Sequence, residues 1–229
     1  MWQGKKKAVT FSFDDGVTQD IRLIEILNKY GLKGTFNINS GLLGLAREIK
    51  GDWGRVDHIK VKASEVKSIY EGHEVAAHSL THPTLVGLDE ETIIRQVEED
   101  RKALESLCGY PIVGMAYPNG TNDDRVAKII QENTPIRYSR TITSTHSFAV
   151  QKENLLRYDP TVYYAAPCFE EIVDKFLASE SDEDQLLYIW GHAYEMDANF
   201  ISWEKFERIC AKLANHEDIF YGTNKEILL

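Results

Sequence analysis

Long apolar runs, clustered basic residues and a secretory signal are all missing from this sequence. No stretch of about 18 apolar residues occurs, so a membrane-spanning helix is not expected. The N-terminus lacks the charged, apolar and small-residue order of a signal peptide, which predicts a cytoplasmic protein. The formal net charge is -10, and Lys5–Lys7 is the only compact basic run. A nucleic-acid partner is therefore excluded, because phosphate backbones require clustered Lys and Arg.

Paired cysteines are absent as well. Cys108, Cys168 and Cys210 are odd in number and widely spaced, and no CxxC pair occurs. Neither a disulfide framework nor a cysteine zinc site is indicated. The 229 residues contain no linker or low-complexity segment, which predicts a single domain over residues 1–229. The sequence leaves the oligomeric state open.

Segments with strand character alternate with segments of helical periodicity along the chain. The expected strands are 8–13, 33–39, 74–78, 112–116, 137–143, 155–158, 185–190 and 218–221. The expected helices are 17–31, 64–71, 89–107, 123–132, 169–177 and 203–213. This alternation predicts a parallel sheet, and about seven units in one domain favour an α/β barrel. Residues 46–60 have no clean period and are expected to form a loop over the mouth of a site.

Side chains capable of chemistry follow several of the expected strands. Asp14 and Asp15 end the first strand before Gly16, and such adjacent carboxylates repel each other unless a cation or proton intervenes. His78 and His82 follow the third strand, four positions apart. Taken separately, the acids could cap a helix and the histidines could be structural. Two histidines and a carboxylate at one face of a barrel instead predict a metal site with an open position for water.

These two motifs resemble those of the NodB-homology polysaccharide deacetylases, carbohydrate esterase family four. The family motifs read Thr-Phe-Asp-Asp-Gly and His-Ser/Thr-x-x-His, and both are nearly intact here. The resemblance runs from Thr10 to about His192 and implies a distorted (β/α)7 barrel. It also implies that Asp14 is the general base. The implied metal ligands are Asp15, His78 and His82, and they suit zinc first, with cobalt, nickel or iron also compatible.

The third family motif, Arg-x-Pro-Tyr/Phe before glycine, is altered in this chain. It aligns with residues 116–120, so that Ala116 stands at the arginine and Asn119 at the aromatic residue. The resemblance implies that the backbone N–H of Asn119 still helps to hold an oxyanion, because a backbone donor does not depend on its side chain. Tyr117 and Pro118 of the same motif are candidates for substrate contact.

A replacement for the missing arginine is also expected, because in the family that arginine orients the base. Arg157 precedes Asp159 near an expected strand end and is a candidate cation for Asp14. The alternative for Arg157 is a surface or structural ion pair, and the two are weighed equally. Asp159 is a further candidate for orienting the base or the substrate.

The fifth family motif, Leu-x-His, corresponds to residues 190–192. Trp190 takes the place of the leucine at the wall of the site, and His192 then resembles the general acid. Glu195 and Asp197 follow closely, and either could orient His192 or meet a sugar hydroxyl. The alternatives are a buried structural histidine and two solvated loop acids.

Together these features predict a metal-dependent hydrolase that removes N-acetyl groups from an N-acetylated sugar, oligosaccharide or polysaccharide. No Ser or Cys lies in a recognisable nucleophile setting, so a covalent acyl-enzyme is not expected. Hydrolysis of a small non-sugar amide or imide is an alternative, because the third motif is altered. A non-catalytic glycan-binding relative on the same barrel is another.

Overall fold

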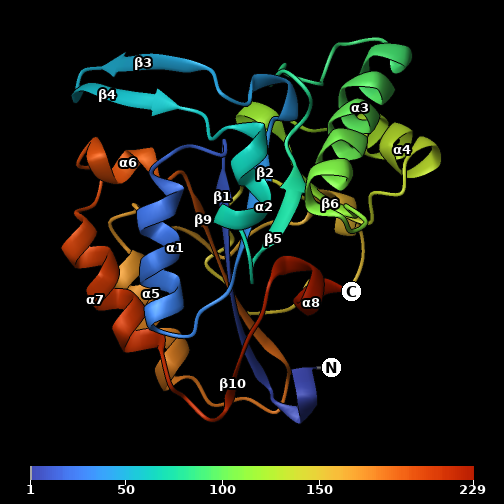
Figure 1. Ribbon diagram of the computed structural model, residues 1–229. Helices are drawn as coiled ribbons and strands as arrows, with labels where there is room; N and C mark the ends of the chain where they lie inside the picture. The colour runs from blue at the N-terminus through green and yellow to red at the C-terminus, as the bar shows by residue number, and fades with distance from the viewer. Residues whose placement is uncertain (1) are drawn as a thin grey trace.

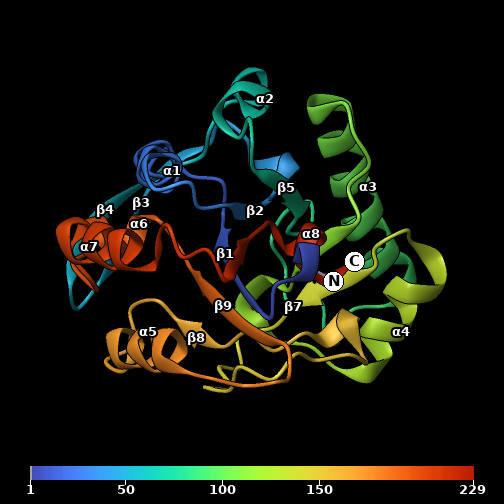
Figure 2. The same cartoon turned by 90° about the horizontal axis from the view of Figure 1, so that it is seen from below.

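The computed structural model describes residues 2–229 and places a parallel sheet inside a layer of helices (Figure 1 and Figure 2). The strand order is β7-β6-β5-β2-β1-β9-β8, and β10 pairs with the beginning of β1. These strands are β1 (Lys7–Asp14), β2 (Gly34–Ile38), β5 (Glu74–Ala77), β6 (Gly114–Ala116), β7 (Tyr138–Arg140), β8 (Val162–Tyr163), β9 (Gln185–Gly191) and β10 (Ile219–Tyr221). The central position of β1 puts its carboxyl end in the middle of the molecule.

All six expected helices are present close to their predicted positions, whereas the short helix Tyr194–Asp197 was not expected. The helices are α1 (Asp20–Lys29), α2 (Val66–Ile69), α3 (Glu90–Cys108), α4 (Asp124–Asn133), α5 (Phe169–Ala178), α6 (Tyr194–Asp197), α7 (Trp203–Leu213) and α8 (Asn224–Leu228). Asp89 and Asp123 cap α3 and α4 by accepting backbone N–H bonds of 2.9 and 2.7 Å, as their sequence positions favour. Within residues 2–229, every helix is too short or too polar to cross a membrane.

The two faces of β1 have different surroundings, which follows from the twofold alternation of side chains along a strand. Phe11 and Phe13 face the helical layer, where each ring centroid lies 6.1 Å from that of Phe206 on α7. Ser12 and Asp14 face the interior of the barrel, where both take part in hydrogen bonds to buried polar side chains. The strand therefore delivers Asp14 into a buried polar environment.

An irregular segment closes the barrel between β7 and β9. The N–H of Tyr158 donates to Ser139 O of β7 (2.8 Å), and the N–H of Thr161 donates to Tyr188 O of β9 (2.9 Å). The expected strand at 155–158 is wrong, because residues Leu155–Arg157 form a 3-10 turn. Asn154 enters that turn with a φ of 53°, and Pro160 cannot donate to a ladder. The expected distorted (β/α)7 barrel is confirmed.

Residues 46–60 form a β-hairpin, so the expectation of a loop is wrong. Strands β3 (Ala46–Gly51) and β4 (Gly54–Ile59) pair antiparallel and project beyond the helical layer (Figure 1). Most side chains of both strands are exposed, so no apolar alternation marks the hairpin in the sequence. At the tip, Trp53 contacts Phe200 with ring centroids 5.7 Å apart, so Trp53 anchors the hairpin to the segment after α6.

Candidate active site

The two adjacent aspartates point into different surroundings at the carboxyl end of β1. Asp14 is the last residue of the strand, whereas Asp15 has a φ of 85° in the left-handed region. A non-glycine residue adopts this conformation only where other contacts hold it there. Both side chains are buried, with residue exposures of 3% and 7%. The turn thus separates two carboxylates that the sequence places side by side.

Asp14 is held by side chains from two other strands of the barrel. The guanidinium of Arg140, itself 1% exposed, pairs with Oδ2 of Asp14, and its Nε donates to Ser12 Oγ (3.2 Å). Asn37 Nδ2 donates to Asp14 Oδ1 (2.8 Å). Burial raises the pKa of Asp14, but Arg140, together with smaller contributions from His78 and His192, outweighs burial and lowers the pKa below its usual range. Asp14 is therefore ionised at neutral pH and can accept a proton.

Asp15 is held by residues at the end of the hairpin. His58 Nε2 lies 3.1 Å from Asp15 Oδ2, and Lys60 Nζ lies 3.0 Å from Oδ1 and 2.6 Å from the backbone oxygen. Burial raises the pKa of Asp15, but the hydrogen bond from His58 and the charge of Lys60 hold it well below its usual range. Neither His58 nor Lys60 belongs to a recognisable motif, so no role is expected for them from the sequence.

His78 and His82 lie beside Asp15, as their motif predicts. One ligand atom from each of these three residues lies within 4.8 Å of the other two. His78 Nδ1 lies 2.8 Å from Ala116 O, so Nδ1–H donates to the carbonyl and Nε2 stays free. Burial lowers the pKa of His78 to about 4 and also lowers the pKa of His82. Both imidazoles are neutral at pH 7, as metal ligands must be.

The chemistry of these donors fits a divalent metal. Two neutral imidazoles and an ionised carboxylate form a set that zinc commonly takes in catalytic sites. The hydrogen bond from His78 to a backbone carbonyl is the kind of support that orients a metal-binding imidazole. Each oxygen of Asp15 keeps a second lone pair after its bond to His58 or Lys60. The cluster of Asp15, His78 and His82 is therefore a candidate metal centre.

A buried carboxylate on α3 fixes the backbone that carries His78. Asp100 accepts bonds from the N–H of Ser40 (2.6 Å) and the N–H of His78 (2.9 Å). Asn39 Nδ2 donates to the backbone oxygen of Ser79 (2.9 Å) from the other side. Burial raises the pKa of Asp100 to about 7. The turn after β5 is thus tied to two neighbouring elements.

His192 faces Asp14 across the site. It follows β9, its Nε2 lies 3.8 Å from Asp14 Oδ2, and its Nδ1 lies 3.0 Å from Glu195 Oε1. Burial lowers the pKa of His192, but the charge and hydrogen bond of Glu195, together with the charges of Asp14 and Asp15, outweigh burial and raise the pKa to about 9. His192 is therefore protonated at pH 7 and can donate a proton. Asp197 instead accepts from Trp203 Nε1 (2.8 Å) and has no contact with His192.

These groups open into a cavity of about 360 Å³. Its lining includes both aspartates, His78, His82 and His192, together with Tyr117, Asn119 and Trp190 from the candidate substrate residues, and Arg47, Ile49 and His58 from the hairpin. Asn119 has a φ of 56°, and its side chain donates to Thr84 Oγ1 (3.0 Å). Pro118 is buried next to it, and Asp159 is engaged with the Thr141 hydroxyl (2.5 Å) outside the lining. A space of this volume suits a small ligand or one unit of a larger one.

Residues 3–137, more than half of the chain, match the model of a family described as polysaccharide deacetylase. The chain belongs to the polysaccharide deacetylase family. Among curated members, the chitooligosaccharide deacetylase of Rhizobium leguminosarum bv. trifolii is 28% identical over 103 residues, 44% of this chain and 40% of that protein. The peptidoglycan-N-acetylglucosamine deacetylase PgdA of Listeria monocytogenes is 25% identical over 126 residues, 54% of this chain and 24% of that protein. The matched region spans less than half the length of both relatives.

A solved polysaccharide deacetylase structure shares the fold over nearly the whole chain. The putative polysaccharide deacetylase from Mycobacterium smegmatis superimposes with a TM-score of 0.65 and 20% identity. The match covers 98% of this chain and 90% of that one. The barrel of the family therefore extends through β9, α7 and β10, beyond the region that the family model matches.

Arg140 occupies a position that accounts for the altered third motif of this chain. Ala116 ends β6, and Arg140 ends β7 directly beside it in register. Neighbouring residues in register on parallel strands present their side chains to the same face. The small side chain of Ala116 leaves space there, and the arginine arrives from the adjacent strand. Arg140 also stacks on Trp190, with its guanidinium carbon 4.9 Å from the ring centroid.

The assignment of Arg157 to Asp14 is a wrong prediction. Arg157 forms an ion pair with Asp124 on α4, and its Nε donates to Asn122 Oδ1 (2.7 Å). Arg157 is the last residue of a 3-10 turn rather than part of a strand, and its side chain reaches the outside of the barrel. The alternative of a surface ion pair is the correct one.

Proposed function

We propose that this chain is a metal-dependent carbohydrate N-deacetylase. The observation that carries the proposal is the pairing of an ionised Asp14 with a protonated His192, 3.8 Å apart, next to a cluster of three candidate metal ligands. Opposite shifts of two pKa values within one site are the arrangement that acid and base roles need. Membership of the polysaccharide deacetylase family supports the same reaction class.

Asp15, His78 and His82 would hold the metal, with zinc as the first choice and cobalt, nickel or iron as alternatives. When bound there, a divalent cation polarises the acetamide carbonyl and lowers the pKa of a water molecule. The remaining chemistry belongs to side chains and backbone groups of this chain.

Asp14 accepts the proton of the attacking water, and Arg140 keeps the carboxylate ionised until it does so. The N–H of Asn119 donates to the oxygen that becomes negative as the carbonyl carbon turns tetrahedral. His192 then delivers its Nε2 proton to the departing sugar nitrogen, while Glu195 holds Nδ1 on the other side of the ring. Acetate and a free amine leave the site.

The substrate class is an N-acetylated glycan. The two curated relatives are named for deacetylation of a chitooligosaccharide and of N-acetylglucosamine in peptidoglycan. The cavity of about 360 Å³ suits one sugar unit placed with its acetamide toward the aspartates. We place an N-acetylglucosamine-containing oligosaccharide first among substrates to be tried.

The test is acetate release from chitooligosaccharides and peptidoglycan fragments, before and after removal of metal with a chelator. Release is expected to stop with chelator and to return with zinc. Asp14→Asn should reduce turnover by a factor of about 100 to 10,000, which is the contribution of a general base. Absence of metal-dependent release across a broad panel of N-acetylated glycans would contradict the proposal.

A small non-sugar amide or imide is the second candidate substrate. It is favoured by Asn119, a polar residue of the cavity lining that stands where the third motif has an aromatic residue. A hydrolase screen with amide turnover and no sugar turnover would select it. A non-catalytic glycan-binding role would be eliminated by any turnover that the Asp14→Asn substitution removes.

A further inference from the structure

His58 connects the hairpin to the candidate metal ligand Asp15. Its side chain is 2% exposed, and its ring centroid lies 5.0 Å from that of Tyr194 on α6. One ring nitrogen, Nε2, lies 3.1 Å from Asp15 Oδ2, and the other, Nδ1, lies 3.3 Å from Nε of Arg47. Arg47 on β3 is the antiparallel partner of His58 on β4. The hairpin register therefore sets the contact between these two side chains.

The two neighbours of His58 determine where its proton lies. A guanidinium can only donate hydrogen bonds, so Nδ1 of His58 must be the unprotonated acceptor of the Arg47 Nε–H. In a neutral imidazole the proton is then on Nε2, where it faces the Asp15 carboxylate, which can only accept. One tautomer satisfies both contacts. Both ring nitrogens are engaged, so His58 supports a ligand rather than serving as one.

We propose that Arg47 and His58 are positioning residues of the metal centre, supplied by the hairpin. His58 holds the Asp15 carboxylate through Nε2–H, and Arg47 fixes the tautomer that makes this bond possible. The inference rests on the proposed metal-dependent function and adds two residues outside the motifs to it. Asp15 needs such support because its backbone has already left β1 in a left-handed conformation.

Zinc binding by the purified metal-free protein, measured calorimetrically, tests the role of His58. His58→Phe removes the donor and keeps a ring. It should raise the zinc dissociation constant by about 10- to 100-fold, as loss of a ligand-orienting group does. His58→Gln keeps an N–H donor at the Nε2 position and should restore affinity to within about threefold of wild type. Circular dichroism verifies that both variants fold. Wild-type affinity in His58→Phe would overturn the inference.

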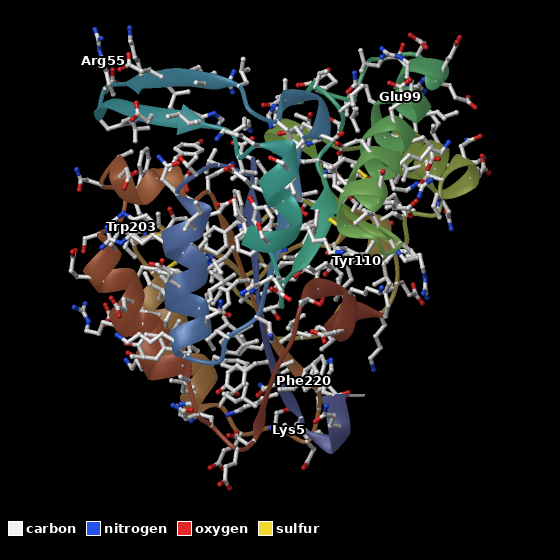
Figure 3. The ribbon with its side chains drawn as sticks, viewed as in Figure 1. Lys5, Arg55, Glu99, Tyr110, Trp203 and Phe220 are labelled. Atoms are coloured by element: carbon white, nitrogen blue, oxygen red, sulfur yellow. The ribbon has the colours of Figure 1, made fainter. Side chains whose placement is uncertain are left out.

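Arg55→Met is the matched control on the same hairpin. Arg55 pairs with Glu48 at 3.7 Å, and Figure 3 shows it at the outer end of the hairpin, away from the barrel. Its replacement should leave zinc affinity unchanged. Equal weakening in Arg55→Met and His58→Phe would mean that the substitutions act through hairpin stability, which would overturn the specific role of His58.

Arg47→Met tests the second half of the proposal at an exposed position, where folding is not at risk. In the wild-type protein without metal, ¹⁵N shifts of the His58 ring should report a proton on Nε2. In Arg47→Met the ring should become a mixture of tautomers, and zinc affinity should fall. A proton on Nδ1 in the wild type would overturn the inference. A wild-type protein that binds no divalent metal would instead overturn the proposed function, which separates the two failures.

Discussion

Asp14 and Asp15 are neighbours in the chain, but they are supported by different regions of the molecule. Asp14 is held by Arg140 and Asn37, both on strands of the barrel. Asp15 is held by His58 and Lys60, at the end of a hairpin that lies outside the barrel. Each carboxylate has its own cation, so both are ionised although they are adjacent.

The supports of Asp14 are part of the barrel itself, whereas the supports of Asp15 come from the β3–β4 hairpin. The proposed base depends on residues whose positions the sheet register sets. The proposed metal ligand depends on how the hairpin packs over the carboxyl ends of the strands. Substitutions in the barrel should therefore affect stability and proton transfer together, whereas substitutions in the hairpin should affect metal binding with little cost in stability.

The largest effect is expected from Arg140→Met. It leaves the buried Asp14 charge without its cation, so the free energy of unfolding should fall by about 3–5 kcal/mol. Without Arg140, burial also raises the pKa of Asp14, and kcat/KM at pH 7 should fall at least about 100-fold. Urea unfolding and acetate release measure the two losses.

Moving the arginine back to β6 sharpens this test. The double variant Ala116→Arg with Arg140→Ala places the arginine on β6, at the position where the family motif has it. Part of the lost activity should return, because the two positions are side by side in register. An Arg140→Met variant with wild-type activity would contradict the assignment of Arg140 to the base.

Glu195→Gln should change the pH dependence of the reaction. His192 has a pKa raised to about 9, so its charge stabilises the folded protein below its usual pKa of about 6.5, and this contribution is lost as the pH rises through 9. Loss of the Glu195 charge removes the largest contribution that opposes burial, while Asp14 and Asp15 still favour the protonated ring, so the pKa of His192 should fall below about 9. At pH 8 the protonated fraction, and with it kcat/KM, should fall severalfold.

The measurement is a pH profile of kcat/KM for both proteins. The wild-type profile should decline near pH 9, and the Glu195→Gln profile should decline at a clearly lower pH. Histidine ring signals in NMR spectra of the metal-free proteins give the same midpoints without substrate. Identical alkaline limbs would remove Glu195 from the proposed mechanism.

A smaller effect is expected from Asp100→Asn, which alters the support of His78. An amide has one acceptor oxygen, so only one of the two N–H groups on Asp100 keeps its partner, at a cost of about 1–3 kcal/mol. The pKa of Asp100 is raised to about 7 in the folded state, so its contribution to stability is full at low pH and declines as the pH rises from about 4 through 7. The stability difference between wild type and variant should therefore be larger at pH 5 than at pH 8 in urea unfolding. An equal difference at both pH values would contradict the assignment.

The sequence predicts the parts of this molecule that depend on local pattern. The apolar alternation of β1 and the helical period of α3 locate both elements, and the motif spacing brings Asp15, His78 and His82 together. Arg140 could be found only by knowing that β7 lies beside β6 with position 140 next to position 116. That register depends on long-range packing, although a charged residue in an expected strand after the altered motif is a usable signal.

The hairpin is a part of the structure that the sequence pattern does not predict. Most of its side chains are exposed, and of the two buried on β4, Val56 and His58, only one is apolar, so hydrophobic periodicity gives no indication of β3 and β4. His58 and Lys60 become recognisable only when the hairpin is placed over Asp15. The strand predicted at 155–158 is wrong because a local apolar pattern was misleading. Leu155 and Leu156 resemble a buried strand, but the neighbouring Asn154 and Pro160 favour a turn.

The smallest effect is expected from Arg157→Met, which tests whether an arginine outside the barrel has any influence on Asp14. Arg157 is the arginine considered for Asp14 from the sequence, but it pairs with Asp124, whose side chain is 90% exposed. A solvent-exposed ion pair contributes about 0–1 kcal/mol, so the unfolding free energy should change by less than that amount. Activity and its pH profile should stay within twofold of wild type, because Asp14 keeps Arg140. A loss of activity in Arg157→Met comparable with that in Arg140→Met would mean that a cation outside the barrel controls the base, and the division between the two aspartates would no longer hold.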